Sequence, residues 1–285
     1  MADRGWWITR VGGELLRRLR EHDLMMMAAA IAFYWLLGII PLLLLGTSAT
    51  GYLLGSSERA VDEMMQVARR LIPRSTIPEV QEFLGTLIRN RHVTGILGLG
   101  FLLWVAMGVF EAIATSLTAI TGGRETRSYL RRKLVALVMM GTAGLLFITA
   151  LMGAWVLGAW SEIEFLLGTR IPLPGFLAAP SFPRYATTIL LTVLLAIVYH
   201  IAPVRAIRWP AATAGALIAG ALWHQAKLLF NWYLMHYARY NLFYGILGGF
   251  IGVVLWLYYT AIILLVGGLL ADVFDRAGRR NRATD

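Results

Sequence analysis

The chain has 285 residues, of which 58% are hydrophobic and only 15% are charged. A soluble domain of this size needs roughly 25% charged residues to cover its surface, so the composition excludes an ordinary soluble globular protein. The net charge of +10 would suggest nucleic-acid binding in a soluble protein, but here the arginines cluster between apolar segments, where membrane proteins carry their cytoplasmic anchors.

The first predicted element, residues 1–27, is a cytoplasmic amphipathic helix in the membrane interface. Trp6, Trp7 and most later apolar residues fall on one half of a helix, and residues 1–24 contain five arginines. A signal peptide has a shorter charged region than this segment, and it ends at a cleavage site with small residues, which this segment does not have. We therefore expect the segment to be retained.

Runs of about 20 apolar residues, the length that crosses a roughly 30 Å hydrocarbon core, recur through residues 28–271. They predict an all-α membrane protein with a bundle of six transmembrane helices. The expected spans are at about 28–54, 94–121, 134–160, 185–202, 210–231 and 245–271. Residues 272–285 are expected to form a basic cytoplasmic tail.

Lysine and arginine counts orient these spans. Sixteen lie on the side that holds both termini and the 122–133 and 203–208 loops, and nine lie on the opposite side. Because basic residues concentrate in cytoplasmic loops, both termini are predicted to be cytoplasmic.

The connection 55–93, on the predicted outer side, has six arginines nearly balanced by five acidic residues. Its apolar residues recur at helical spacing before Pro73 and again after Pro78, so we expect two amphipathic helices on the outer face. A lid over a cavity is the sharper alternative for the same segment.

Polar residues within the spans are the candidates for function, because an ionisable group at the bilayer centre costs at least about 2.5 kcal/mol unless it faces protein or water. In the second span, Trp104, Glu111 and Thr115 form one polar stripe along a helix. In the fifth span, His224, Lys227 and Asn231 form another. One interpretation is a shared hydrophilic cavity or substrate path, and the other is a buried ion pair that only fixes packing. Helix rise brings Glu111 closer in depth to His224 than to Lys227, which favours a link through His224 or water.

Proline and glycine mark two further positions. Pro41 interrupts the first span, and a carbonyl freed by the kink could face substrate, although packing is the simpler explanation. Gly245, Gly248, Gly249 and Gly252 give overlapping GxxxG spacings, which favour close helix packing.

Motifs for catalysis are missing from the sequence. It contains no GxSxG, HExxH or Walker motif, no cysteine, and only scattered histidines. We therefore expect no enzymatic activity, no cofactor or metal site, and no nucleic-acid partner.

Three groups of residues resemble the BrkB/YihY-type membrane proteins, long misannotated as ribonuclease BN. They are Ala30–Tyr34 with Ile40–Leu42, Gly215 through Trp223 to Lys227 and Phe230, and Tyr244–Gly245 with Trp256–Tyr258, Leu265 and Gly267. The chain departs from that pattern at His224, where the family often has glutamate, and at Gly267-Gly268-Leu269, in place of Gly-Ala-Glu. The resemblance implies six helices, a bacterial inner-membrane location, an association with virulence and envelope phenotypes, and no established reaction.

The leading hypothesis is a transporter or flippase-like protein for a lipid or other amphipathic envelope substrate. The alternative is a non-transporting membrane scaffold for envelope assembly, and ribonuclease activity is not expected. Membrane lipids are the expected partners, and a homo-oligomer is compatible with the sequence.

Overall fold

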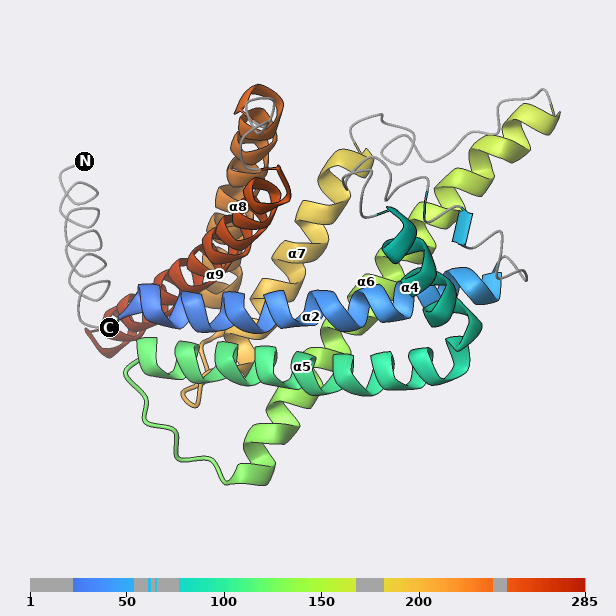
Figure 1. The fold of residues 1–285 in the computed structure, drawn as a ribbon. Coiled ribbons are helices and arrows are strands. Elements are labelled where there is room, and N and C mark those ends of the chain that lie inside the picture. Colours follow the sequence, from blue (N-terminus) through green and yellow to red (C-terminus); the bar gives the residue numbers. More distant parts are fainter. Residues whose placement is uncertain are drawn as a thin grey trace. The chain divides into compact units, whose positions relative to one another are not determined.

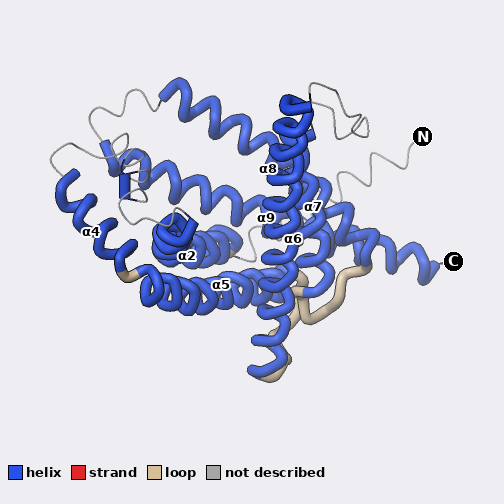
Figure 2. The backbone as a smooth tube through the Cα atoms, turned by 90° about the vertical axis from the view of Figure 1, so that its right-hand side faces the viewer, coloured by secondary structure: helices blue, strands red, loops and turns tan. Residues whose placement is uncertain are grey.

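The structure, a computed structural model, describes residues 23–53, 61–62, 65, 77–167, 182–237 and 245–284. The helices with defined bounds (Figure 1) are α2 (Leu24–Leu53), α4 (Ile77–Arg89), α5 (Arg91–Ile120), α6 (Tyr129–Leu167), α7 (Phe182–Ile201), α8 (Trp209–Tyr237) and α9 (Gly245–Thr284). Helices and loops are the only elements in the described ranges (Figure 2). The expected all-α class is therefore confirmed for this part of the chain.

Four segments within the described helices are long and apolar enough to cross a membrane. They are Leu24–Gly46, His92–Ile120, Tyr129–Gly153 and Phe250–Arg279, and a shorter apolar helix covers Ala186–Ile201. α8 is not among them, because polar residues such as His224, Gln225 and Lys227 lower its hydropathy. The structure thus confirms several membrane-spanning candidates, while the count of six spans stays a prediction.

Two predicted amphipathic elements fall partly or wholly on residues that the structure does not describe. The N-terminal helix lies outside the described residues up to residue 22, and the first helix of the 55–93 connection lies largely outside them. The second helix of that connection corresponds to α4, which begins one residue before Pro78. Proline suits this first turn, because its missing N–H has no helical partner there. The position of α4 on the outer face stays a prediction.

The last helix is longer than the sequence pattern indicated. We expected the span to end at residue 271 and a tail to follow, but α9 continues to Thr284. Two acidic residues beyond that point pair with arginines one turn later, at the i,i+4 spacing that stabilises a helix. Helical structure therefore extends through residues that hydropathy alone assigns to the tail.

The chain forms two compact units. The first comprises Met1–Ala28, Phe110–Phe230 and Tyr259–Asp285, and the second comprises Ala29–Val109 and Asn231–Tyr258. The candidate residues Glu111, His224 and Lys227 belong to the first unit.

In the second unit, α2 and α5 pack side by side (Figure 1). A Cβ at Gly108 would lie 2.7 Å from the Tyr34 ring, and a Cβ at Gly95 would lie 2.7 Å from the Ser48 hydroxyl. The contacts advance along α2 as they recede along α5, so the two helices are antiparallel. Glycines of α5 thus provide the space into which side chains of α2 fit.

In the first unit, α8 and α9 cross at four small residues. A Cβ on Gly215 would lie 2.5 Å from the Gly267 carbonyl oxygen and 2.7 Å from the Ala271 Cβ, and a Cβ on Gly267 would lie 2.6 Å from the Ala219 Cβ. Each helix thus contributes two small residues four positions apart, a small-xxx-small motif that lets the two backbones approach closely. The glycines expected to pack, near the start of α9, include Gly252, where a Cβ would meet nothing within 4 Å.

The buried side chain of Tyr199, in α7, joins this crossing. Its hydroxyl donates a 2.7 Å hydrogen bond to the Leu264 carbonyl oxygen of α9. Its ring lies beside Gly268, which also faces Leu117 of α5. α7 in turn packs against α6. The core of the first unit therefore brings α5, α7, α8 and α9 together around one tyrosine.

A methyl group at this crossing should destabilise the protein. We expect Gly267→Ala to lower the free energy of unfolding by about 2 kcal/mol, because the added methyl group would collide with the Tyr199 hydroxyl and the Ala219 Cβ, and neither can move away without disturbing the crossing. Gly141→Ala is the matched control in α6, since a Cβ there meets open space and alanine favours a helix. Thermal unfolding in detergent, followed by size exclusion, measures both; equal melting temperatures would contradict the close packing.

Candidate functional site

Glu111 is paired with the beginning of α6. It lies nine residues before the end of α5, and its side chain is only 20% exposed. Its Oε1 atom lies 2.9 Å from Lys133 Nζ and 3.9 Å from Arg132 Nε. The 2.9 Å approach is close enough for an ion pair, but its angles are not those of a hydrogen bond, and Oε1 has no hydrogen-bond partner in the described structure. We refer to Glu111, Arg132 and Lys133 with Tyr129 as the α6 basic cluster.

Tyr129, the first residue of α6, completes this cluster. Its ring centroid lies 5.8 Å from the Arg132 guanidinium carbon and 5.5 Å from Lys133 Nζ. Both cations are therefore within the range in which an aromatic ring attracts positive charge. The cluster thus joins one carboxylate, two cations and one phenol at the start of an apolar helix.

The start of α6 explains why this pairing escaped sequence reasoning. The count of positive charges predicts a cytoplasmic loop that ends at residue 133, but α6 already begins at Tyr129. Arg132 and Lys133 are therefore part of a helix that adjoins α5. Glu111 finds its partners there and makes no ion pair or hydrogen bond with His224 or Lys227.

His224 and Lys227 have other neighbours. The His224 Nδ1 atom lies 3.3 Å from the Thr188 hydroxyl oxygen, which links α8 to α7. Lys227 Nζ lies 5.1 Å from the centroid of the Trp223 ring on its own helix. α7 and α8 approach closely one turn from the histidine, because a Cβ at Gly220 would collide with the Thr192 hydroxyl. The contacts of His224 with Thr188 and of Gly220 with Thr192 make a polar strip between α7 and α8.

Within the described part of the chain, the remaining predicted site residues take no part in these ion pairs and hydrogen bonds. Trp104 is exposed and stacks on Phe101 with ring centroids 5.8 Å apart. Thr115 and Asn231 are exposed, and Pro41 is buried within α2. Trp104, Pro41 and Asn231 belong to the second unit, whereas Glu111 belongs to the first. A common substrate path through all of them stays a prediction.

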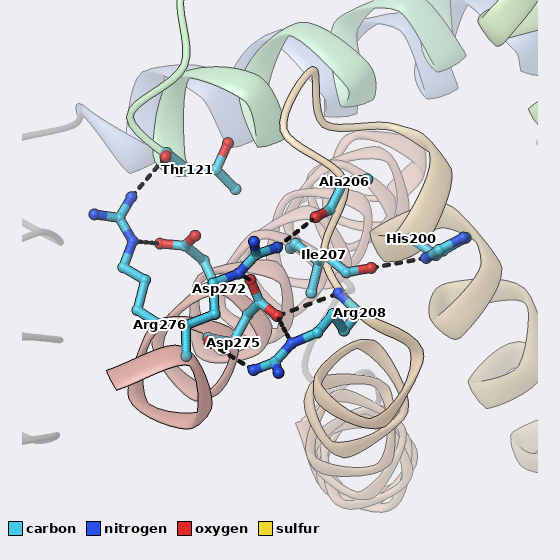
Figure 3. A network of polar contacts seen from close by, with 9 residues as sticks. Thr121, His200, Ala206, Ile207, Arg208, Asp272, Asp275 and Arg276 are labelled. Atoms are coloured by element: carbon cyan, nitrogen blue, oxygen red, sulfur yellow. Dashed lines mark hydrogen bonds and ion pairs between the residues drawn. The ribbon is translucent and has the colours of Figure 1, made fainter. Parts of the chain in front are cut away.

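A second charged group, which the sequence analysis missed, lies near the end of α9 (Figure 3). Asp275 is only 1% exposed, and its Oδ1 and Oδ2 atoms each accept a 2.7 Å hydrogen bond, from Arg208 Nε and Arg279 Nε. Asp272, equally buried, accepts one of 2.7 Å from Arg276 Nε. We call these five residues the α9 acidic cluster.

The arginines of this cluster also reach the backbone of other elements (Figure 3). Arg276 donates to the Thr121 carbonyl oxygen at the end of α5, at 2.7 Å, and Arg279 donates to the Ala206 carbonyl oxygen at 3.3 Å. Arg208 further donates to the Asp275 carbonyl oxygen at 2.9 Å. The cluster therefore ties the end of α9 to α5 and to the connection between α7 and α8.

That connection, residues 202–208, is held from further sides. Arg127 donates to the carbonyl oxygens of Ala202 and Pro203 at 2.9 and 2.7 Å. The Thr118 hydroxyl accepts a 3.3 Å bond from the Val204 amide. His200 Nδ1 lies 2.7 Å from the Ile207 carbonyl oxygen (Figure 3). Backbone groups of this connection, which has no helical partners for them, are thus satisfied by side chains of the first unit.

The sequence did contain a signal for the acidic cluster. Asp272 and Asp275 each precede an arginine by four residues, a spacing that forms ion pairs on a helix. Hydropathy and charge, however, predict only a basic tail over residues 272–285, in which these arginines count as topology signals. Burial of both carboxylates, which depends on neighbouring helices, distinguishes them from a solvated charge run.

Comparison with known proteins gives the family. A family model described as virulence factor BrkB matches residues 15–285. The chain belongs to the BrkB family. The apolar helices of the fold are consistent with this family of membrane proteins. No solved structure matches the chain significantly.

Curated relatives span most of the chain. It is 27% identical over 259 residues to a ribonuclease-like protein of Bacillus subtilis, YfkH, which covers 90% of this chain and 91% of that relative. It is 25% identical over 256 residues to a UPF0761 membrane protein of Tolumonas auensis, covering 88% and 80% of the two. A UPF0761 membrane protein of Haemophilus influenzae is 23% identical over 268 residues, covering 93% and 94%. The chain is thus a membrane protein of the BrkB and UPF0761 group.

Removal of one buried carboxylate should weaken the first unit. We expect Asp275→Asn to lower the free energy of unfolding by about 2 kcal/mol, because two charge-assisted hydrogen bonds lose their charge. Glu82→Gln, at an exposed position of α4, is the control for loss of one negative charge. Thermal unfolding in detergent provides the measurement, and an unchanged melting temperature for Asp275→Asn would refute a stabilising role.

Proposed function

We propose that this BrkB-family protein moves a lipid or another amphipathic envelope substrate across the bacterial inner membrane, as a transporter or flippase. The observation that carries the proposal is the ion pair between Glu111 and the start of α6. An ionisable group inside an apolar helix is costly unless it faces protein or water, and such groups commonly mark substrate or ion pathways. The Oε1 atom of Glu111 has charged partners but no hydrogen-bond partner among the described residues.

The polar strip between α7 and α8 supports the same proposal. His224 and Lys227 are only partly buried, and Thr188 and Thr192 place hydroxyl groups along the facing helix. Hydroxyl and imidazole groups between apolar helices offer hydrogen bonds to a polar headgroup or to water. A substrate with a charged head and apolar chains would use such groups while its chains stay in lipid.

The location and topology form part of the proposal. We place the protein in the inner membrane with six spans and both termini in the cytoplasm, because basic residues are concentrated on one side. The proposal includes no catalysed reaction, cofactor or nucleic-acid partner.

A non-transporting scaffold for envelope assembly is the alternative. The α9 acidic cluster favours it, because its short ion pairs and backbone hydrogen bonds hold three elements in one arrangement. A rigid unit of this kind would suit a protein whose role is to hold partners in place. Transport would instead require that some polar contacts exchange during a cycle.

Transport should depend on the charge of Glu111. In proteoliposomes that contain fluorescent phospholipid, we expect the wild-type protein to expose inner-leaflet lipid to an external quencher. Glu111→Gln should lower the rate at least about tenfold, because it removes the negative charge that pairs with Lys133, and ionisable groups inside apolar helices commonly mark substrate pathways. Leu255→Ala, at an exposed apolar position of α9, should retain the rate. No lipid movement by the wild-type protein would favour the scaffold.

The topology can be tested independently of transport. Reporters fused after Arg282 and within the 122–133 loop should report the cytoplasm, because these segments are rich in arginine. A reporter near Gly175 should report the outside. A reversed result at any one of the three positions would contradict the six-span arrangement.

A further inference from the structure

We propose that Arg132 and Lys133, with the Tyr129 hydroxyphenyl group beside them, bind the phosphate of an anionic phospholipid. The inference names the headgroup chemistry of the substrate class and in that respect rests on the proposed function. Three features of the α6 basic cluster support it: the hydrogen-bonding state of the cations, the apolar residues around them, and the carboxylate of Glu111.

The cations of the cluster have donors to offer. Arg132 Nε is buried and has no hydrogen-bond partner in the described structure, and the approach of Lys133 to Glu111 lacks hydrogen-bond geometry. The Arg132 and Lys133 side chains are nevertheless 37% and 31% exposed, so a ligand can reach other atoms of these side chains without a change at the buried Nε. Phosphate oxygens accept such donors strongly, and arginine binds them in a planar fork.

The α9 acidic cluster does not offer the same opportunity, although it contains more arginines. The Nε atoms of Arg208, Arg276 and Arg279 each donate a 2.7 Å hydrogen bond to a carboxylate, and one further nitrogen of each reaches a backbone carbonyl. A phosphate would have to displace these bonds. The α6 basic cluster is therefore the better anion site of the two.

The surroundings of the α6 basic cluster fit a lipid better than a free phosphate. Leu130 is 78% exposed and Leu134 is 58% exposed, on the same two turns of α6 as the cations. α6 is apolar enough to cross a membrane from Tyr129 onward, so its first turns lie where the chain enters the bilayer. Basic side chains at that depth meet lipid phosphates, while exposed leucines meet acyl chains.

Glu111 gives the site a built-in competitor. Its carboxylate lies 2.9 Å from Lys133 Nζ and thus offers the negative charge that a phosphate would otherwise supply. A phospholipid that binds Lys133 must share or replace this ion pair. Neutralising Glu111 should therefore strengthen lipid binding, whereas neutralising its two partners should weaken it. A purely structural ion pair would give no such opposite signs.

The test measures lipid binding to the purified full-length chain in neutral detergent by native mass spectrometry. Phosphatidylglycerol is titrated against the wild type, Arg132→Gln/Lys133→Gln and Glu111→Gln. Arg124→Gln/Arg205→Gln removes the same charge from exposed positions outside the cluster and serves as the control. Phosphatidylcholine and inorganic phosphate replace phosphatidylglycerol in two further arms, which separate an anionic lipid from a zwitterionic lipid and from a free anion.

We expect the cluster double variant to bind phosphatidylglycerol roughly thirtyfold more weakly, since each basic residue near an anionic surface contributes roughly a fivefold affinity change. Glu111→Gln should bind about fivefold more tightly by the same reasoning. The control variant, and Lys133→Arg, which keeps the charge, should stay near wild type. Phosphatidylcholine and inorganic phosphate should bind more weakly than phosphatidylglycerol.

Three results would overturn the inference. These are equal affinity for phosphatidylglycerol and phosphatidylcholine, equal loss in the cluster and control double variants, or weaker binding by Glu111→Gln. If the cluster double variant does not fold, the sign of the Glu111→Gln effect still decides. Lipid binding without lipid movement would overturn the proposed function alone, and movement with unchanged lipid selectivity in the cluster variant would overturn this inference alone.

Discussion

The close approach of α8 and α9 is the contact from which most of the first unit follows. Gly215 and Ala219 meet Gly267 and Ala271, so the two backbones come together without intervening side chains. Helices in lipid gain little from burying apolar surface against each other, because lipid tails are equally apolar, and they depend on close packing instead. A set of small residues at one height therefore fixes the crossing and the register.

That register accounts for the α9 acidic cluster. Arg208 lies directly before the start of α8, two turns before Gly215, and Asp275 lies two turns after Gly267 along α9. The paired positions show that the two helices run antiparallel, so these two residues lie at the same height, where Asp275 accepts hydrogen bonds from Arg208. The ion pairs thus close the end of a crossing that glycine and alanine have already set. A buried carboxylate is stable there because several donors reach it at once.

The two charged groups of the first unit differ in how fully they are satisfied. In the α9 acidic cluster, arginines bond both to carboxylates and to backbone carbonyls, which suits a fixed joint. In the α6 basic cluster, Glu111 and Arg132 keep buried atoms without hydrogen-bond partners in the described structure. Such groups are costly in a low-dielectric setting unless a ligand or water completes them. This contrast is the reason why we assign a structural role to the α9 acidic cluster and propose a binding role for the α6 basic cluster.

The sequence by itself determined the class of protein, because hydropathy and helical length are local properties of a chain. It gave apolar helices, the BrkB family, and Glu111 as an intramembrane charge that needs a partner. It did not identify that partner, since charge counting assigned Lys133 to a loop, whereas α6 already begins at Tyr129 and brings Lys133 next to Glu111 of α5. Nor did it identify Gly267 as a crossing point or Asp275 as a buried anion. Both depend on which residues of distant helices arrive at one height, and that is decided only when the helices pack in three dimensions.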